Sequence, residues 1–147
     1  MAEVFLKRRL KEEGVAGVEV FSAGVAAEAG RHCPPETLKA LDKRGADGRG
    51  HRSRPLTPDL VDGADLILAM TRDHQMAVAL RFPRTVGKLK LFRSYAGLSG
   101  DVEDPFNGRA SAHDACAAEV GEAVEKILKK LRTDIDETQH LHPSEER

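Results

Sequence analysis

Few cysteines and no long apolar run occur in this sequence, and both absences narrow the classes of protein to which it can belong. The 147 residues include 2 cysteines, Cys33 and Cys116, which lack the spacing of metal ligands and are too few for a disulfide scaffold. No apolar stretch approaches the roughly 20 residues that cross a bilayer. Residues 1–13 alternate charged and apolar side chains, unlike the core of a signal peptide. We therefore expect a cytoplasmic protein without a membrane segment.

An excess of one sign of charge is also absent. Lysine and arginine number 23 against 24 acidic residues, and no long block of one sign occurs. Because a nucleic-acid-binding surface usually shows as a basic cluster, we expect no nucleic-acid partner. With 40% hydrophobic residues, the chain is long enough for one compact core and too short for two ordinary domains. We expect one domain over residues 1–132 and a mobile polar tail over residues 133–147.

Five helices are predicted from apolar spacing and from residues that favour helix starts. Thr57 and Thr71 are typical N-cap residues, Pro58 suits a first helical position, and Ser111 with Asp114 resembles a capping box. The helices are expected at residues 1–13, from 34 or 35 to about 44, and at 57–63, 71–82 and 111–132. The first has no residue before its apolar stripe that could act as an N-cap, so the chain is expected to open inside a helix.

Three strands alternate with these helices. Residues 18–21 have the composition of a short strand, and residues 66–70 form a nearly continuous apolar run, typical of a parallel strand covered on both faces. Residues 88–91 alternate as a half-exposed edge strand does. The alternation predicts an α/β fold in three layers, with a short parallel sheet flanked by helices. Because sheets usually have about four to six strands, we expect a further strand upstream of the first helix.

Five short motifs occur in an order that points to a known family. They are Met1-Ala2-Glu3, Ser22-Ala23-Gly24, His51, the stretch 64–70, and Asp104-Pro105-Phe106. In this order and spacing, over about residues 1–132, the chain resembles the low-molecular-weight protein tyrosine phosphatases. It is most similar to the bacterial branch that includes protein-arginine phosphatases, which have Asp-Pro-Phe in place of Asp-Pro-Tyr. The resemblance implies a four-stranded parallel sheet and hydrolysis of phosphotyrosine or phosphoarginine in proteins.

The resemblance also implies a catalytic loop that the 147 residues do not contain. In the family, a Cys-x5-Arg-Ser loop follows the first strand and precedes the Met-Ala-Glu motif. Its thiolate attacks phosphorus while its amides and arginine bind the phosphoryl oxygens. Six positions after Cys33 stands Lys39, and six after Cys116 stands Glu122, so neither cysteine has the required arginine. The chain by itself is therefore expected to be inactive, and neither cysteine is assigned a role.

The Asp-Pro-Phe motif carries the strongest catalytic candidate. By resemblance, Asp104 acts as general acid and later activates water, although an aspartate before Pro105 is also an ordinary turn residue. By resemblance, Phe106 forms an aromatic wall beside the phosphorylated side chain, and it serves equally well as an apolar anchor for its own loop.

Ser22 and His51 correspond to residues that support the catalytic loop in the family. From the residues alone, they are a strand-end hydroxyl and a surface histidine. His140 and His142 are too few to form a metal site, so we expect neither a metal nor another cofactor.

Two hypotheses of different classes remain. In the first, the chain belongs to a phosphatase acting on phosphorylated proteins, and its start codon has been assigned to an internal methionine. In the second, the truncated chain is a non-catalytic binding or regulatory module, whose missing interior strand leaves sheet edges open to self-association. Arsenate reductase chemistry is disfavoured, because the helix after Met70 has no redox cysteine nearby.

Overall fold

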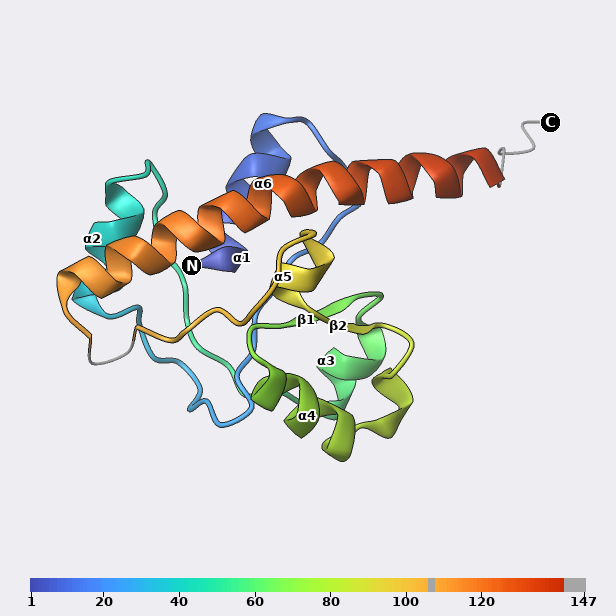
Figure 1. Cartoon of the computed structure of the whole chain (residues 1–147), viewed down its shortest axis with the longest axis horizontal. Helices are drawn as coiled ribbons and strands as arrows, with labels where there is room; N and C mark the ends of the chain where they lie inside the picture. The colour runs from blue at the N-terminus through green and yellow to red at the C-terminus, as the bar shows by residue number, and fades with distance from the viewer. Residues whose placement is uncertain (106–107, 142–147) are drawn as a thin grey trace.

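The fold places helices on both sides of a small parallel sheet. The computed structural model describes residues 1–105 and 108–141. In Figure 1, α6 crosses one side of the molecule beside α1 and α2, the strands lie in the middle, and α3 and α4 cover the opposite side. The elements are α1 (Ala2–Glu12), α2 (Pro35–Asp42), α3 (Pro58–Gly63), β1 (Ile67–Ala69), α4 (Arg72–Arg81), η1 (Pro83–Thr85), β2 (Leu89–Leu91), α5 (Phe92–Tyr95) and α6 (Ala110–Leu141). The predicted α/β class is confirmed.

The sheet of the described residues has two strands rather than three. β1 and β2 pair in parallel, with Ile67 opposite Leu89 and Ala69 opposite Leu91. The prediction of a strand at residues 18–21 is wrong, because this segment pairs with no strand within the described residues. A strand needs a neighbour for its backbone groups, and the amide of Ser22 at the end of this segment bonds to a side chain instead.

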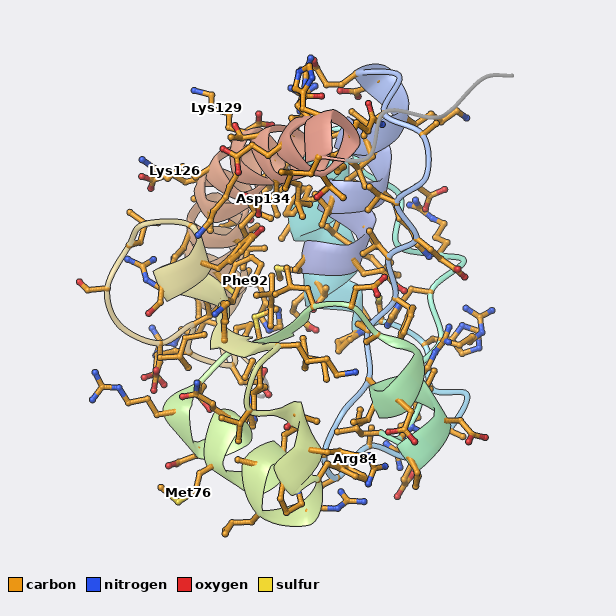
Figure 2. The ribbon with its side chains drawn as sticks, turned by 90° about the vertical axis from the view of Figure 1, so that its right-hand side faces the viewer. Met76, Arg84, Phe92, Lys126, Lys129 and Asp134 are labelled. Carbon is orange, nitrogen blue, oxygen red and sulfur yellow. The ribbon has the colours of Figure 1, made fainter. Side chains whose placement is uncertain are left out.

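Two apolar cores lie on the two sides of the sheet. The larger joins α1, α2, α5 and α6, and the smaller lies under α3 and α4. In Figure 2, Phe92 lies on the inner side of α5, whereas Lys126 and Lys129 point outward from α6. The best-buried members of the larger core include Leu41, Val124 and Ile127. Burial of each such side chain stabilises the fold by about 1.5–3 kcal/mol, so the pairing of α6 with α1 and α2 accounts for much of the stability.

The last helix is longer than its sequence pattern predicts. It was expected to end near Arg132, yet it continues to Leu141, so residues 133–141 are helical. Extending an existing helix costs little once the first turn is formed. Tyr95 of α5 adds a contact, because its hydroxyl donates to Oδ2 of Asp134 at 2.7 Å. Residues 142–147 of the expected tail lie outside the described residues.

After β2 the chain forms the short helix α5, and residues 96–105 contain no further helix or strand. Across the described ranges, no helix is long and apolar enough to cross a membrane.

Candidate active site

A buried carboxylate joins two of the residues singled out by sequence. Glu3 lies in the first turn of α1 and is 8% exposed. Its carboxylate accepts the backbone N–H of Ser22 at 3.1 Å and the Ser22 hydroxyl at 3.4 Å. It also contacts Nδ1 of His51 at 2.7 Å and Nζ of Lys7 at 3.3 Å. We call Glu3, Lys7, Ser22 and His51 the Glu3 cluster.

The protonation of the Glu3 cluster follows from its surroundings. Burial is the largest single influence on the pKa of Glu3 and raises it, but Lys7 and His51 together outweigh burial, so this pKa lies below its ordinary value. An ionised carboxylate only accepts hydrogen bonds, which means that Nδ1 of His51 carries a proton. The contact therefore fixes the orientation of the imidazole ring.

A polar pocket of about 340 Å³ adjoins this cluster. Three cationic residues on its wall are already engaged: Lys7 with Glu3, Arg52 with the carbonyl oxygens of Arg49 and His51, and Arg54 over the ring of Phe21. Its lining consists of Glu3, Val4, Lys7, Asp47, Gly50, His51, Arg52 and Arg54. The two acidic residues, Glu3 and Asp47, offset part of the positive charge of these three side chains.

Asp104 lies on a loop that is fastened beside the carboxyl end of β1. We call residues 96–105 the Asp104 loop. The amide of Val102 donates to the carbonyl oxygen of Met70 at 2.9 Å, just after β1. Oδ1 of Asp101 accepts the amide of Arg72 at 3.1 Å, in the first turn of α4. In parallel sheets, ligands bind beyond the carboxyl ends of the strands, so this is the expected edge for a reacting group.

The two parts of the site border the same apolar core. Met1 and Val4, at the start of α1, pack against the larger core. Ala96 and Val102 of the Asp104 loop are buried members of that core. The start of α1 and the Asp104 loop are therefore joined through it.

Neither thiol has the surroundings of a nucleophile. Burial is the main cause that raises the pKa of both Cys33 and Cys116, so both are protonated at neutral pH. Sγ of Cys116 faces the carbonyl oxygen of Glu103 at 3.8 Å, where the thiol acts as a weak donor. These environments are those of structural cysteines.

Some of the candidates make no contribution that can be described. Phe106 and His142 lie outside the described residues, and His140 is exposed near the end of α6. Within residues 1–105 and 108–141, no group of three or more histidine, cysteine or acidic side chains is arranged to hold a metal ion.

Comparisons with known proteins identify the family. Residues 1–137 match the family described as low molecular weight phosphotyrosine protein phosphatase. The chain belongs to this family. A protein-arginine-phosphatase of Bacillus subtilis is 36% identical over 135 residues, which cover 91% of this chain and 89% of the relative. A probable low molecular weight protein-tyrosine-phosphatase, EpsP of Ralstonia solanacearum, is 28% identical over 127 residues, covering 86% of each.

Solved structures of the family have the same fold as this phosphatase-family chain. The YwlE arginine phosphatase of Geobacillus stearothermophilus superposes with a TM-score of 0.84 at 29% identity, covering 99% of this chain and 89% of that one. A YwlE arginine phosphatase with a phosphorylated active-site serine superposes with a TM-score of 0.86 at 35% identity. The match covers 90% of this chain and 87% of that one.

The role of Glu3 was not predicted, although its position in the sequence carried a signal. Glu3, Leu6 and Leu10 are spaced so that they share one helix face, and all three are buried. A charged residue on the apolar face of a helix needs a polar partner in the interior. Which partner it has, here Ser22 and His51, depends on the tertiary fold.

Proposed function

We propose that this family member provides the scaffold and the general acid of a phosphatase that hydrolyses phosphotyrosine or phosphoarginine in proteins. The observation that carries the proposal is the match of residues 1–137 to the phosphatase family, together with the Asp104 loop fastened beside the carboxyl end of β1. The names of the relatives support both substrates, since some are arginine and others tyrosine phosphatases.

The proposed reaction has two steps, and Asp104 transfers a proton in each. A cysteine thiolate attacks phosphorus, the bond from phosphorus to the leaving oxygen or nitrogen breaks, and the carboxyl of Asp104 gives its proton to the leaving group. Water then attacks the cysteinyl phosphate, the carboxylate of Asp104 takes a proton from it, and inorganic phosphate leaves with the thiolate restored.

The remaining candidates have supporting roles in this proposal. Phe106 forms one wall beside the phosphorylated side chain. Ser22 and His51 support the backbone of the catalytic loop, and Glu3 holds both of them in place.

The nucleophile is proposed to come from a Cys-x5-Arg-Ser loop that the 147 residues do not include. Cys33 and Cys116 lack an arginine six positions on, and burial keeps both thiols protonated. The 147-residue polypeptide is therefore expected to be inactive alone.

The decisive experiment compares this polypeptide with a version extended upstream through the native reading frame. Both are assayed for hydrolysis of p-nitrophenyl phosphate, and a variant of the added cysteine serves as control. Activity that occurs only in the extended form supports the proposal. Activity in the 147-residue chain contradicts the assignment of the nucleophile. Inactivity of both, with folded protein, favours a non-catalytic binding or regulatory module.

Phosphoarginine is the first substrate to test. Protein-arginine-phosphatases of Bacillus subtilis and Geobacillus stearothermophilus are 36% and 32% identical to this chain, against 28% for EpsP. The extended enzyme is expected to release phosphate faster from arginine-phosphorylated casein than from tyrosine-phosphorylated casein. The opposite order assigns the chain to tyrosine phosphatases.

A further inference from the structure

Arg93 connects the start of the Asp104 loop to α6. Arg93 lies in α5, and its side chain is 19% exposed. Its Nε donates to the carbonyl oxygen of Ser99 at 2.7 Å, and its Nη1 donates to Oε1 of Glu119 at 2.7 Å. The backbone carbonyl of Arg93 also accepts the amide of Leu98 at 2.8 Å. One guanidinium group therefore bridges the loop and the long helix.

The part of the loop that Arg93 holds has little stiffness of its own. Gly97 and Gly100 flank Ser99, and both have a left-handed backbone, with φ of +77° and +89°. Glycine adopts this conformation without steric cost but also loses the most conformational freedom when it is ordered. External contacts must therefore hold the loop in one shape, and the contact of Arg93 with Ser99 lies between the two glycines.

The other end of the loop is fixed at the junction of β1 and α4. The contacts of Asp101 with Arg72 and of Val102 with Met70 lie there, and the Val102 side chain is buried. Asp104 follows two residues after Val102. The segment that leads to Asp104 is thus attached on each side of the second glycine, once by Arg93 and once at the β1–α4 junction.

We infer that Arg93 is a positioning residue for Asp104: by binding Ser99 and Glu119 together, it fixes the direction from which the carboxyl group reaches the leaving group. The inference rests on the proposed function. A general acid must lie within hydrogen-bond reach of the atom that it protonates, and a displacement of about 1 Å can reduce the rate up to about 100-fold. Arg93 acts through the loop and does not touch the substrate.

The test uses leaving groups that need protonation to different degrees. In the extended enzyme, kcat/KM is measured for p-nitrophenyl phosphate, whose leaving group departs readily as an anion, and for phenyl phosphate, whose leaving group needs the acid. Arg93→Gln is expected to reduce kcat/KM for phenyl phosphate about tenfold more than for p-nitrophenyl phosphate, because the proton transfer is misaligned.

Two further variants separate positioning from general stability. In an Asp104→Asn background, Arg93→Gln should leave the ratio of the two kcat/KM values unchanged, since the acid on which it acts is gone. Arg132→Gln is the matched control, because it removes another ion pair between α6 and a neighbouring segment, that of Arg132 with Glu13 at 3.1 Å. This control should leave the ratio unchanged in each background, at the value that wild type or Asp104→Asn has without it.

Hydrogen exchange in the 147-residue chain gives a readout that does not depend on activity. Arg93→Gln should speed exchange of the Val102 and Arg72 amides, and Arg132→Gln should not. An unchanged leaving-group ratio in an active Arg93→Gln enzyme overturns the inference. The inference is also overturned if Arg93→Gln changes the ratio further when it is added to Asp104→Asn. An inactive wild-type extended enzyme instead overturns the proposed function, so the two failures are distinguishable.

Discussion

The Glu3 cluster and the Asp104 loop both border the larger core but are held in different ways. Glu3 is buried, and four polar contacts from three residues converge on its carboxylate. The Asp104 loop is tied mainly through backbone groups and the side chains of Arg93 and Asp101, with flexible glycines between the ties. The first arrangement favours stability, and the second holds the segment that carries Asp104, the proposed general acid.

The difference leads to separate expectations for the two regions. A buried, fully paired charge is costly to disturb, because each partner loses its hydrogen bond in a place that water reaches poorly. A surface loop tolerates substitution of a reacting side chain with little loss of stability. Mutations in the Glu3 cluster should therefore reduce mainly the free energy of unfolding, whereas mutations of Asp104 should reduce mainly activity.

The largest effect is expected from Asp104→Asn in the extended enzyme. The amide keeps the size of the side chain but cannot donate the proton, so kcat/KM for phenyl phosphate should fall by about 100-fold or more. The urea midpoint should fall much less than it does in a Glu3 variant. A loss of stability comparable with that of a Glu3 variant would remove the contrast between the two regions.

The second effect is a loss of stability in Glu3→Gln. The amide can still accept one hydrogen bond, but it has no charge to attract Lys7 and His51. We therefore expect the free energy of unfolding of the 147-residue chain, measured in urea, to fall by about 2 kcal/mol. Glu12→Gln is the matched control, because Glu12 pairs with Arg9 on the exposed face of the same helix at 2.8 Å. That substitution should cost less than about 0.5 kcal/mol. Equal losses in the two variants would show that burial of Glu3 adds nothing.

The parts of the fold that were predicted correctly are those with local signals. The apolar run at residues 66–70 and the alternation at 88–91 sufficed for the two paired strands, and Thr57 and Thr71 cap their helices as predicted. Residues 18–21 have a strand-like composition, but composition cannot supply a neighbouring strand. The end of α6 was placed too early because the sequence beyond Arg132 has few apolar residues.

The candidate site was predicted as separate residues and not as an arrangement. Ser22, His51 and Asp104 were found from the order of the motifs. Their grouping depends on Glu3 and on the contacts of the Asp104 loop, which join segments far apart in the chain. Arg93 carried no sequence signal, because an arginine is usually a solvated surface charge.

The pH dependence of stability provides a finer test of the Glu3 cluster. The pKa of Glu3 is lower in the folded chain than its ordinary value, so the unfolded chain binds more protons in the acidic range. The contribution of Glu3 is therefore present above the ordinary glutamate pKa of about 4.3 and is lost as the pH falls through the folded value. The difference in the free energy of unfolding between wild type and Glu3→Gln, measured in urea, should become smaller as the pH is lowered from 7. A constant gap would mean that the charge of Glu3 contributes nothing.

The smallest effect is expected at the contact between Tyr95 and Asp134, which holds the extension of α6. Burial, and then the contact with Asp134, raise the pKa of Tyr95, so the hydroxyl stays protonated and donates to the carboxylate. Tyr95→Phe removes this hydrogen bond but keeps the aromatic ring. In the structure, Nζ of Lys130 lies 4.2 Å from the centroid of the Tyr95 ring. We expect a loss of about 1 kcal/mol and faster hydrogen exchange over residues 133–141.

Asp134→Asn is the matched control for this contact, since its amide oxygen still accepts from Tyr95, and it should cause a smaller change in exchange. Unchanged exchange in Tyr95→Phe would mean that helix propagation alone keeps the last turns of α6 ordered. Faster exchange would show that one buried hydroxyl extends the helix beyond the point at which its apolar stripe ends.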